Sequence, residues 1–202
     1  MTQVLLASRN AKKLEELRRI LASTADTAGI EVVGLADVPP FPEAPETGAT
    51  FEENALAKAR DAVAATGLPA VADDSGIAVD ALNGMPGVLS ARWAGGAKDD
   101  LANLTLVLEQ VADVPDERLT AAFVCAAALV RPDGTEVVVR GEWRGTLARK
   151  PRGTNGFGYD PIFVPEGETR TSAELPAAEK DAISHRGRAL TQLLPQLRAL
   201  SM

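Results

Sequence analysis

Two adjacent carboxylates, followed at once by serine and glycine, are the residues of this chain best suited to chemistry. Asp73 and Asp74 lie between an apolar segment at 68–72 and another at 77–79. Burying an unpaired carboxylate is costly, so carboxylates in such surroundings are usually hydrogen-bonded, ion-paired or bound to a metal. The spacing predicts a strand that ends at the acids and a turn at Ser75-Gly76. Taken alone, the motif fits a solvated turn as well as a metal site.

A basic loop near the start of the chain is a second candidate. An apolar run at 3–7 predicts a strand, and leucines at helical spacing predict a helix over 12–22. Ser8 and Asn10 lie in the loop between them, and two lysines open the helix. Backbone amides and the dipole at a helix start favour anions. The glycine-rich Walker A pattern is absent, so the segment predicts either an anion site of another kind or surface lysines.

Two further clusters lie toward the end of the chain. Residues 150–161 (KPRGTNGFGYDP) combine three glycines, two aromatic rings and an acid, which fits a ligand wall or an irregular packed turn. The single histidine, His185, precedes Arg186 at the start of a helix predicted over 184–200. A lone histidine is usually structural, but this one has cationic neighbours and could line an anionic pocket.

The elements that must position these residues form a mixed α/β pattern. A strand is expected at 31–35, followed by a proline- and acid-rich loop at 36–49 that contains Glu43 and Glu46. Thr50 and Glu53 form a capping box for a helix that ends at Gly67. This gives Glu53 a structural role, and Lys58 falls away from the apolar face of the helix.

The middle of the chain predicts one more helix and a long hairpin. The helix covers 99–112, and the hairpin pairs 119–131 with 135–147 across a Pro-Asp-Gly turn. Cys125 lies inside the hairpin, so we interpret it as a packing residue rather than a nucleophile, which needs an exposed, electropositive setting.

Composition restricts the classes of function. The chain has 202 residues, 46% hydrophobic residues and a net charge of −7, which suits one domain and argues against binding to a nucleic acid polymer or an anionic membrane. No apolar run is long enough to span a bilayer, and the first residues are too short for a signal peptide. A single cysteine excludes an internal disulfide, so a cytoplasmic protein is expected.

Five motifs, taken in order, resemble the dITP/XTP (inosine triphosphate) pyrophosphatase family. They are SRNAKK at 8–13, ETGATFEENALAKA at 46–59, ADDSGIAVDALNGMPGVLSARW at 72–93, GFGYDPIF at 156–163 and EKDAISHR at 179–186. The resemblance implies one domain over 1–202, with a long central mixed β-sheet flanked by helices and two lobes enclosing a nucleotide cleft. It also implies a homodimer and Mg²⁺-dependent hydrolysis of ITP, XTP and dITP to the monophosphate and pyrophosphate.

The resemblance also implies roles for individual residues. Asp74 is expected to be the proton acceptor and a metal ligand, and Glu46 a second metal ligand. The substrate contacts are expected to be Ser8, Arg9, Asn10, Ala11, Lys12, Lys13, Ser75, Phe157, Gly158, Tyr159, Asp160, Lys180, His185 and Arg186. The phosphate loop departs from the family at two positions, with arginine at position 9 where glycine is frequent and serine at position 8 where threonine is common.

Chemistry favours metal binding and water positioning by Asp74, because a tightly bound metal and a high pKa on one carboxylate exclude each other. Asp73 is left to support the turn or the second metal shell. Donors at the O6 edge of the base would explain a preference for 6-keto purines. Three alternatives remain open: a nucleotide-binding module without hydrolysis, a γ-phosphatase with Asp73 or Asp74 as nucleophile, and a thiol hydrolase that uses Cys125 and His185.

Overall fold

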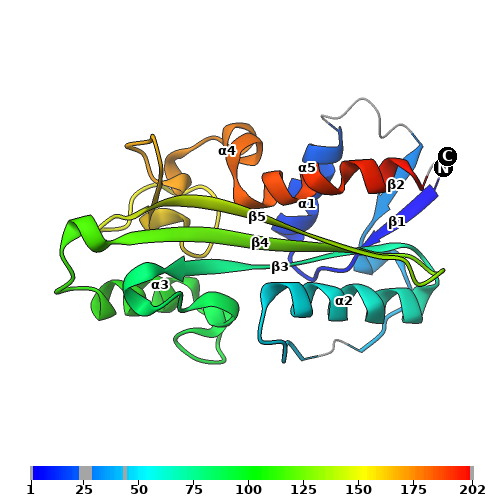
Figure 1. The fold of residues 1–202 in the computed structure, drawn as a ribbon, viewed down its shortest axis with the longest axis horizontal. Helices are drawn as coiled ribbons and strands as arrows, with labels where there is room; N and C mark the ends of the chain where they lie inside the picture. Colours follow the sequence, from blue (N-terminus) through cyan, green and yellow to red (C-terminus); the bar gives the residue numbers. More distant parts are fainter. Residues whose placement is uncertain (1, 23–28, 43–44, 201–202) are drawn as a thin grey trace. The chain divides into compact units, whose positions relative to one another are not determined.

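The chain forms a mixed α/β fold around one six-stranded sheet, which confirms the predicted fold class (Figure 1). The computed structural model describes residues 2–22, 29–42 and 45–200. The strands are β1 (Thr2–Leu6), β2 (Ile30–Val33), β3 (Ala70–Val79), β4 (Thr120–Val130), β5 (Glu136–Leu147) and β6 (Phe163–Pro165). The helices are α1 (Ala11–Ala22), α2 (Phe51–Thr66), α3 (Asp100–Gln110), α4 (Ala177–Ile183) and α5 (His185–Arg198).

The strand order in the sheet is β2-β1-β3-β4-β5-β6. Strand β1 pairs in parallel with both β2 and β3, with Leu5 opposite Val33 on one side and opposite Ala70 on the other. Strand β6 pairs with β5 in the antiparallel direction. The sheet is therefore mixed, as expected, and β3 and β4 lie inside it with hydrogen-bonded neighbours on both sides.

The chain divides into two compact units, each made of several chain segments. The first unit comprises 1–74, 125–141 and 186–202, and the second comprises 75–124 and 142–185. The chain passes between the units inside β3, β4 and β5 and once more at the start of α5. Each unit therefore contains part of the three long strands.

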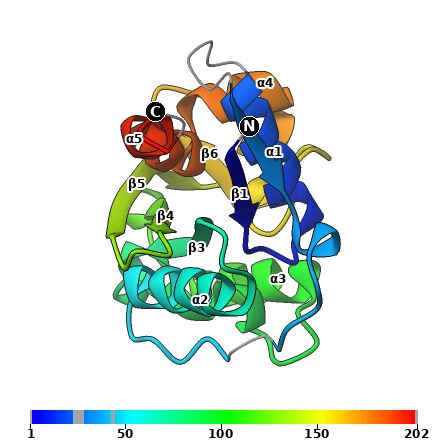
Figure 2. The same cartoon turned by 90° about the vertical axis from the view of Figure 1, so that its right-hand side faces the viewer.

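In the first unit, helices cover both faces of the sheet (Figures 1 and 2). Apolar residues of α1 and α5 pack on β1, β3 and β4 in one buried cluster, which includes Leu17, Leu193 and Val71. On the other face, Ala62 of α2 packs against Leu5 and its neighbours. In the second unit the core is formed around large side chains: Phe123, Trp143, Tyr159, Ile162, Phe163 and Leu175.

Helix α2 begins and ends as its sequence predicts. The Thr50 side chain accepts a hydrogen bond from the Glu53 amide at 3.1 Å, and Gly67 ends the helix in the left-handed region at φ 70°. The Glu53 carboxylate accepts from the Ala49 amide at 2.7 Å, one residue before the position that the capping box predicts. The structural role of Glu53 is thus confirmed.

The predicted turn at Ser75-Gly76 is wrong, because β3 runs without interruption from Ala70 to Val79. Strand β3 lies between β1 and β4 in the sheet, and ladder hydrogen bonds within the sheet outweigh the local turn preference of serine and glycine. Side chains along a strand alternate between faces, so Asp73 and Asp74 point to opposite sides of the sheet.

Smaller differences concern the ends of elements. Strand β2 ends at Val33, and Leu35 belongs to a 3₁₀ turn in which the Asp37 carboxylate accepts from the Gly34 amide at 2.8 Å. The last predicted helix begins directly after Ser184, as expected, but the short helix α4 precedes it. Glu43 lies outside the described residues. None of the described helices is long and apolar enough to span a membrane.

Candidate active site

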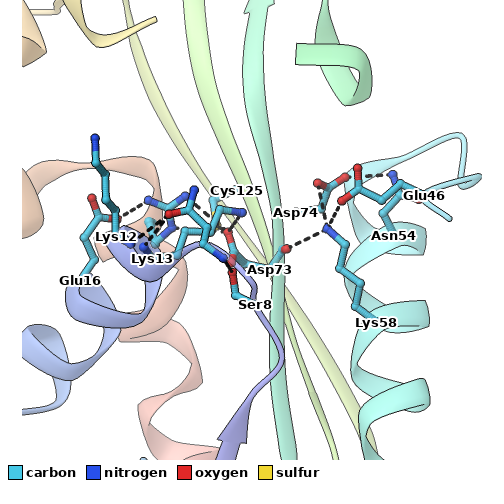
Figure 3. A network of polar contacts seen from close by, with 12 residues as sticks. Ser8, Lys12, Lys13, Glu16, Glu46, Asn54, Lys58, Asp73, Asp74 and Cys125 are labelled. Atoms are coloured by element: carbon cyan, nitrogen blue, oxygen red, sulfur yellow. Dashed lines mark hydrogen bonds and ion pairs between the residues drawn. The ribbon is translucent and has the colours of Figure 1, made fainter. Parts of the chain in front are cut away.

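The Asp74 side chain lies on the face of β3 that is covered by α2, and it has two partners from that helix (Figure 3). Asn54 donates from Nδ2 to Oδ2 of Asp74 at 2.9 Å. The Lys58 ammonium lies 3.5 Å from Oδ1 of Asp74 and also forms an ion pair with Glu46. The two carboxylates expected to bind metal are therefore linked through one ammonium group.

Burial raises the pKa of Asp74. The Lys58 charge and the Asn54 hydrogen bond oppose this effect, and the nearby Glu46 carboxylate adds to it. Burial acts to lower the pKa of Lys58, but Asp74 and Glu46 outweigh it and the pKa is raised. Lys58 is therefore cationic at neutral pH, and Asp74 is a carboxylate whose environment partly disfavours its charge.

Asp73 lies on the opposite face and belongs to a different network, in which it is the counter-ion of two cations (Figure 3). Its Oδ2 lies 2.8 Å from Lys13 Nζ and 3.4 Å from Arg186 Nε. Arg186 also forms an ion pair with the buried Glu16. Burial alone would raise the pKa of Asp73, but Lys13 and Arg186 lower it well below the usual range. Asp73 thus supports no turn and acts as a buried structural charge.

The Cys125 thiol faces this second network, with Sγ 3.8 Å from Asp73 Oδ2. It is fully buried, and burial together with the negative charge of Asp73 raises its pKa to about 12. A thiol in this state is protonated at neutral pH and is a poor nucleophile. The role of Cys125 as a packing residue is therefore supported, and the thiol-hydrolase alternative is not.

The predicted phosphate loop at 8–13 is ordered largely by its own side chains. Asn10 caps α1, since its Oδ1 accepts from the amides of Lys12 at 3.0 Å and Lys13 at 3.3 Å. Ser8 accepts from the Asn10 amide at 3.2 Å, and Arg9 donates to the Phe41 carbonyl at 3.3 Å. Anion binding here would therefore depend on the hydroxyl and the cationic side chains more than on the capped amides.

In the second unit, the aromatic loop at 156–160 is organised by the buried carboxylate of Asp160. It accepts from Lys180 Nζ at 2.6 Å, from the Phe157 amide at 2.9 Å and from the Ser172 hydroxyl at 2.7 Å. Lys180 also lies over the Phe157 ring, 5.6 Å from its centre. The half-buried Phe157 is thereby held in place from two directions.

Other predicted contacts in this unit are buried in its core. His185 stacks on Phe123 with ring centres 4.8 Å apart, and Tyr159 donates to the Ser90 carbonyl at 2.7 Å. Burial raises the pKa of Tyr159, so its hydroxyl remains a donor. Gly158, by contrast, is partly exposed, and its amide donates to Asp100 at the surface at 2.9 Å.

The predicted residues are divided between the two units, and within the first unit Asp74 and Glu46 lie on the opposite face of β3 from Lys13 and Arg186. The first unit contains Ser8, Arg9, Asn10, Ala11, Lys12, Lys13, Glu46, Asp74 and Arg186, and the second contains Ser75, Phe157, Gly158, Tyr159, Asp160, Lys180 and His185. Sequence reasoning missed the contacts of Asn54 and Lys58 with Asp74. Asn54 could have been found, because it is a polar residue on the apolar face of α2. Lys58 could not, because the sequence pattern places it away from that face.

The donor set at Asp74 and Glu46 fits one kind of metal site. Among residues 2–22, 29–42 and 45–200, no group of three or more histidine, cysteine, aspartate and glutamate side chains could hold a metal ion. Mg²⁺ is commonly bound by only one or two carboxylates together with substrate phosphates and waters. The two carboxylates therefore fit Mg²⁺ that arrives with a phosphate ligand, and do not form a cage for a resident ion.

Fold and side chains define a mixed α/β protein with paired, oppositely charged groups on both faces of β3. A model of the Ham1 family matches residues 4–196. The chain belongs to the Ham1 family.

The relatives cover nearly the whole chain. A dITP/XTP pyrophosphatase of Nocardia farcinica is 70% identical over 201 residues, which is 100% of this chain and 97% of the relative. One from Streptomyces coelicolor is 59% identical over 202 residues, with 99% of each chain covered. Among solved structures, a HAM1 protein from Coxiella burnetii has a TM-score of 0.86 at 44% identity and covers 98% of this chain and 100% of its own.

Proposed function

We propose that this protein is a pyrophosphatase of non-standard purine nucleoside triphosphates such as ITP, XTP and dITP. The observation that carries the proposal is the 70% identity, over the full chain, to a protein named dITP/XTP pyrophosphatase. The contacts of Asp74 with Asn54 and Lys58 supply a chemical setting for the reaction.

In the proposed reaction, water attacks the α-phosphorus and the bond between the α- and β-phosphates breaks, which yields the monophosphate and pyrophosphate. Asp74 orients the attacking water. A group that holds the nucleophile in line for attack and can accept its proton contributes to catalysis by positioning and by general base action. The exposed Lys12 and the hydroxyl of Ser8 bind the triphosphate. Prepositioned cations stabilise the charge that develops in the transition state.

Asp74 and Glu46 are the residues that would hold Mg²⁺. When bound, Mg²⁺ would neutralise phosphate charge and polarise the reacting phosphate. Lys58 pairs with both carboxylates, so we propose that its ammonium moves from between them toward the triphosphate when the substrate complex binds.

In the second unit, Phe157 is the proposed contact for the purine ring, because its ring is half-buried and held by Lys180 and Asp160. Aromatic rings stack on nucleotide bases with little dependence on which base it is. We further propose that the protein is a homodimer, as the resemblance implies, and that it works in the cytoplasm, for which its single cysteine is the argument. Sedimentation of the purified protein would test the assembly.

Product analysis tests the proposed reaction. Incubation with ITP, XTP, GTP and ATP in the presence of Mg²⁺ should release pyrophosphate and the monophosphate, fastest from ITP and XTP. The substitution Asp74→Asn should lower kcat by about 100-fold or more, the range expected for loss of a positioned acid–base group. Orthophosphate and a nucleoside diphosphate would instead identify a γ-phosphatase, and no product would identify a binding module.

A further inference from the structure

Asn54 is a buried polar residue of α2 to which the proposed reaction gives no step. Only 2% of its surface is exposed, and it lies four residues after the helix cap at Thr50. Asparagine is a weaker helix former than alanine or leucine. A buried amide also costs free energy unless it is hydrogen-bonded. Propensity and burial therefore do not explain this residue, and its partners must.

The two ends of the Asn54 amide bond to two different segments. Its Nδ2 donates to Asp74 Oδ2 on β3 at 2.9 Å. Its Oδ1 accepts from the Gly48 amide at 2.8 Å, in the short loop that also carries Glu46. One side chain thus joins the two segments that provide the candidate metal-binding carboxylates, and Figure 3 shows its contact with Asp74.

Gly48 supports this reading because the loop backbone approaches α2 closely at that point. A Cβ atom at position 48 would lie 2.6 Å from Asn54 Oδ1 and 2.8 Å from the Cβ of Glu53. Both distances are shorter than van der Waals contact, so only glycine permits the approach. The next amide, that of Ala49, donates separately to Glu53 at 2.7 Å.

We propose that Asn54 is a positioning residue that fixes the orientation of the Asp74 carboxylate and ties the Glu46 loop to it. The part concerning catalysis rests on the proposed function. The donor of Asn54 gives one oxygen of Asp74 a fixed partner and thereby sets the plane of the carboxylate. A misplacement of about 1 Å in such a group can lower a rate about 100-fold.

Two substitutions separate the two hydrogen bonds. Asn54→Leu removes both and keeps the branched shape of the side chain. Asn54→Asp keeps an acceptor for the Gly48 amide but replaces the donor to Asp74 with a second acceptor. In both variants kcat for ITP should fall about 10- to 100-fold while KM changes by less than about threefold, because an interaction that acts in the transition state affects kcat.

Amide hydrogen exchange, measured without nucleotide or metal, tests the loop directly. The Gly48 amide should exchange at least about tenfold faster in Asn54→Leu, because it loses its acceptor, and should stay protected in Asn54→Asp. The Ala49 amide should be unchanged in both variants. Failure of the wild type to release pyrophosphate would refute the proposed function, whereas the exchange rates would still decide whether Asn54 holds the loop.

Asn103 offers a matched control in the second unit. It is also 2% exposed and lies four residues after a helix cap, Asp99 of α3. Its amide accepts from the Ala94 amide at 2.7 Å and donates to the Ala91 carbonyl at 3.2 Å. Asn103→Leu should lose stability as Asn54→Leu does, but should keep kcat per folded molecule within about twofold of the wild type.

Three results would overturn the proposal. The first is a wild-type kcat in both Asn54 variants after correction for the folded fraction. The second is an equal loss of kcat in Asn103→Leu, which would identify general destabilisation as the cause. The third is unchanged exchange of the Gly48 amide in Asn54→Leu.

Discussion

Asp73 and Asp74 are neighbours of the same residue type, and the faces of β3 give them different tasks. Asp73 contacts Lys13 and Arg186 and has a lowered pKa, so it is ionised and balances buried cations. Asp74 has a raised pKa, and its partner Lys58 is shared with Glu46. A carboxylate that folding does not fully stabilise is a better candidate for chemistry than one that neutralises fixed charges.

This difference predicts opposite effects of the same substitution on stability. Asp73→Asn leaves Lys13 and Arg186 short of a counter-ion and should lower the free energy of unfolding by about 3–5 kcal/mol, as expected when one member of a buried ion pair is removed. Asp74→Asn replaces a group whose charged form is disfavoured by burial, so stability should be unchanged or increased. Urea unfolding at neutral pH measures both values, and a stable Asp73→Asn would contradict the role of Asp73 as counter-ion.

At the scale of elements, the loop at 156–160 depends on the space around the Asp160 carboxylate. Gly156 has φ 73°, and a Cβ atom there would collide with that carboxylate. Gly167 has a similar φ of 83°, but a Cβ atom there would meet no other atom within 4 Å. The two glycines thus share a backbone requirement and differ in packing.

Gly156→Ala should therefore do more harm than Gly167→Ala. Gly167→Ala should lose about 1–2 kcal/mol of stability, the cost of a side chain in the left-handed region, and Gly156→Ala should lose more because of the collision. Only Gly156→Ala should also displace Phe157 and raise KM for ITP, by about tenfold if about 1.4 kcal/mol of binding is lost. Steady-state kinetics and thermal unfolding of the two variants test this, and equal KM values would show that Asp160 does not control the loop.

The sequence pattern predicted those helices and strands whose ends are set by nearby residues, such as a helix cap or a hairpin turn. Helix α2 has its own cap at Thr50 and its own end at Gly67, and the β4–β5 hairpin has a turn between two regular runs. The sequence of β3 was misread at Ser75-Gly76, since the cause of its continuity is pairing within the sheet. The seven-residue helix α4 is too short to show a helical period.

The candidate site was predictable in its residue types but not in its pairing. The five motifs identify Asp74, Glu46 and the basic loop. Asp73, however, pairs with Lys13 and with Arg186, and Arg186 lies 113 residues away in sequence. Lys58 was missed because the apolar stripe of α2 shows which face packs, and does not show that a long side chain beside it reaches Asp74.

For the whole molecule, the division into two units is a division in space and not along the chain. The chain passes between the units inside β3, β4 and β5, so neither unit is a continuous segment that could be expressed alone. Unfolding of either unit would break strands that the other unit needs. We therefore expect one cooperative transition.

Two built-in probes test this expectation. Both tryptophans, Trp93 and Trp143, lie in the second unit, and the single cysteine, Cys125, lies buried in the first. In urea at pH 8, the thiol should become accessible to alkylation at the same midpoint at which tryptophan fluorescence changes. With its pKa raised to about 12, Cys125 should not react in the folded protein. Separate midpoints would show that the units unfold independently.

The opposite directions of Asp73 and Asp74 also limit how this protein can change over evolution. Inserting or deleting one residue in β3 before Asp73 would exchange the faces of the two side chains. The carboxylate of Asp73 would then lie on the side of Lys58, and the carboxylate of Asp74 would lie on the side of Lys13 and Arg186. Tolerated insertions and deletions should therefore fall in the loops, so that the number of residues in β3 before Asp73 stays constant and each carboxylate keeps its face of the sheet.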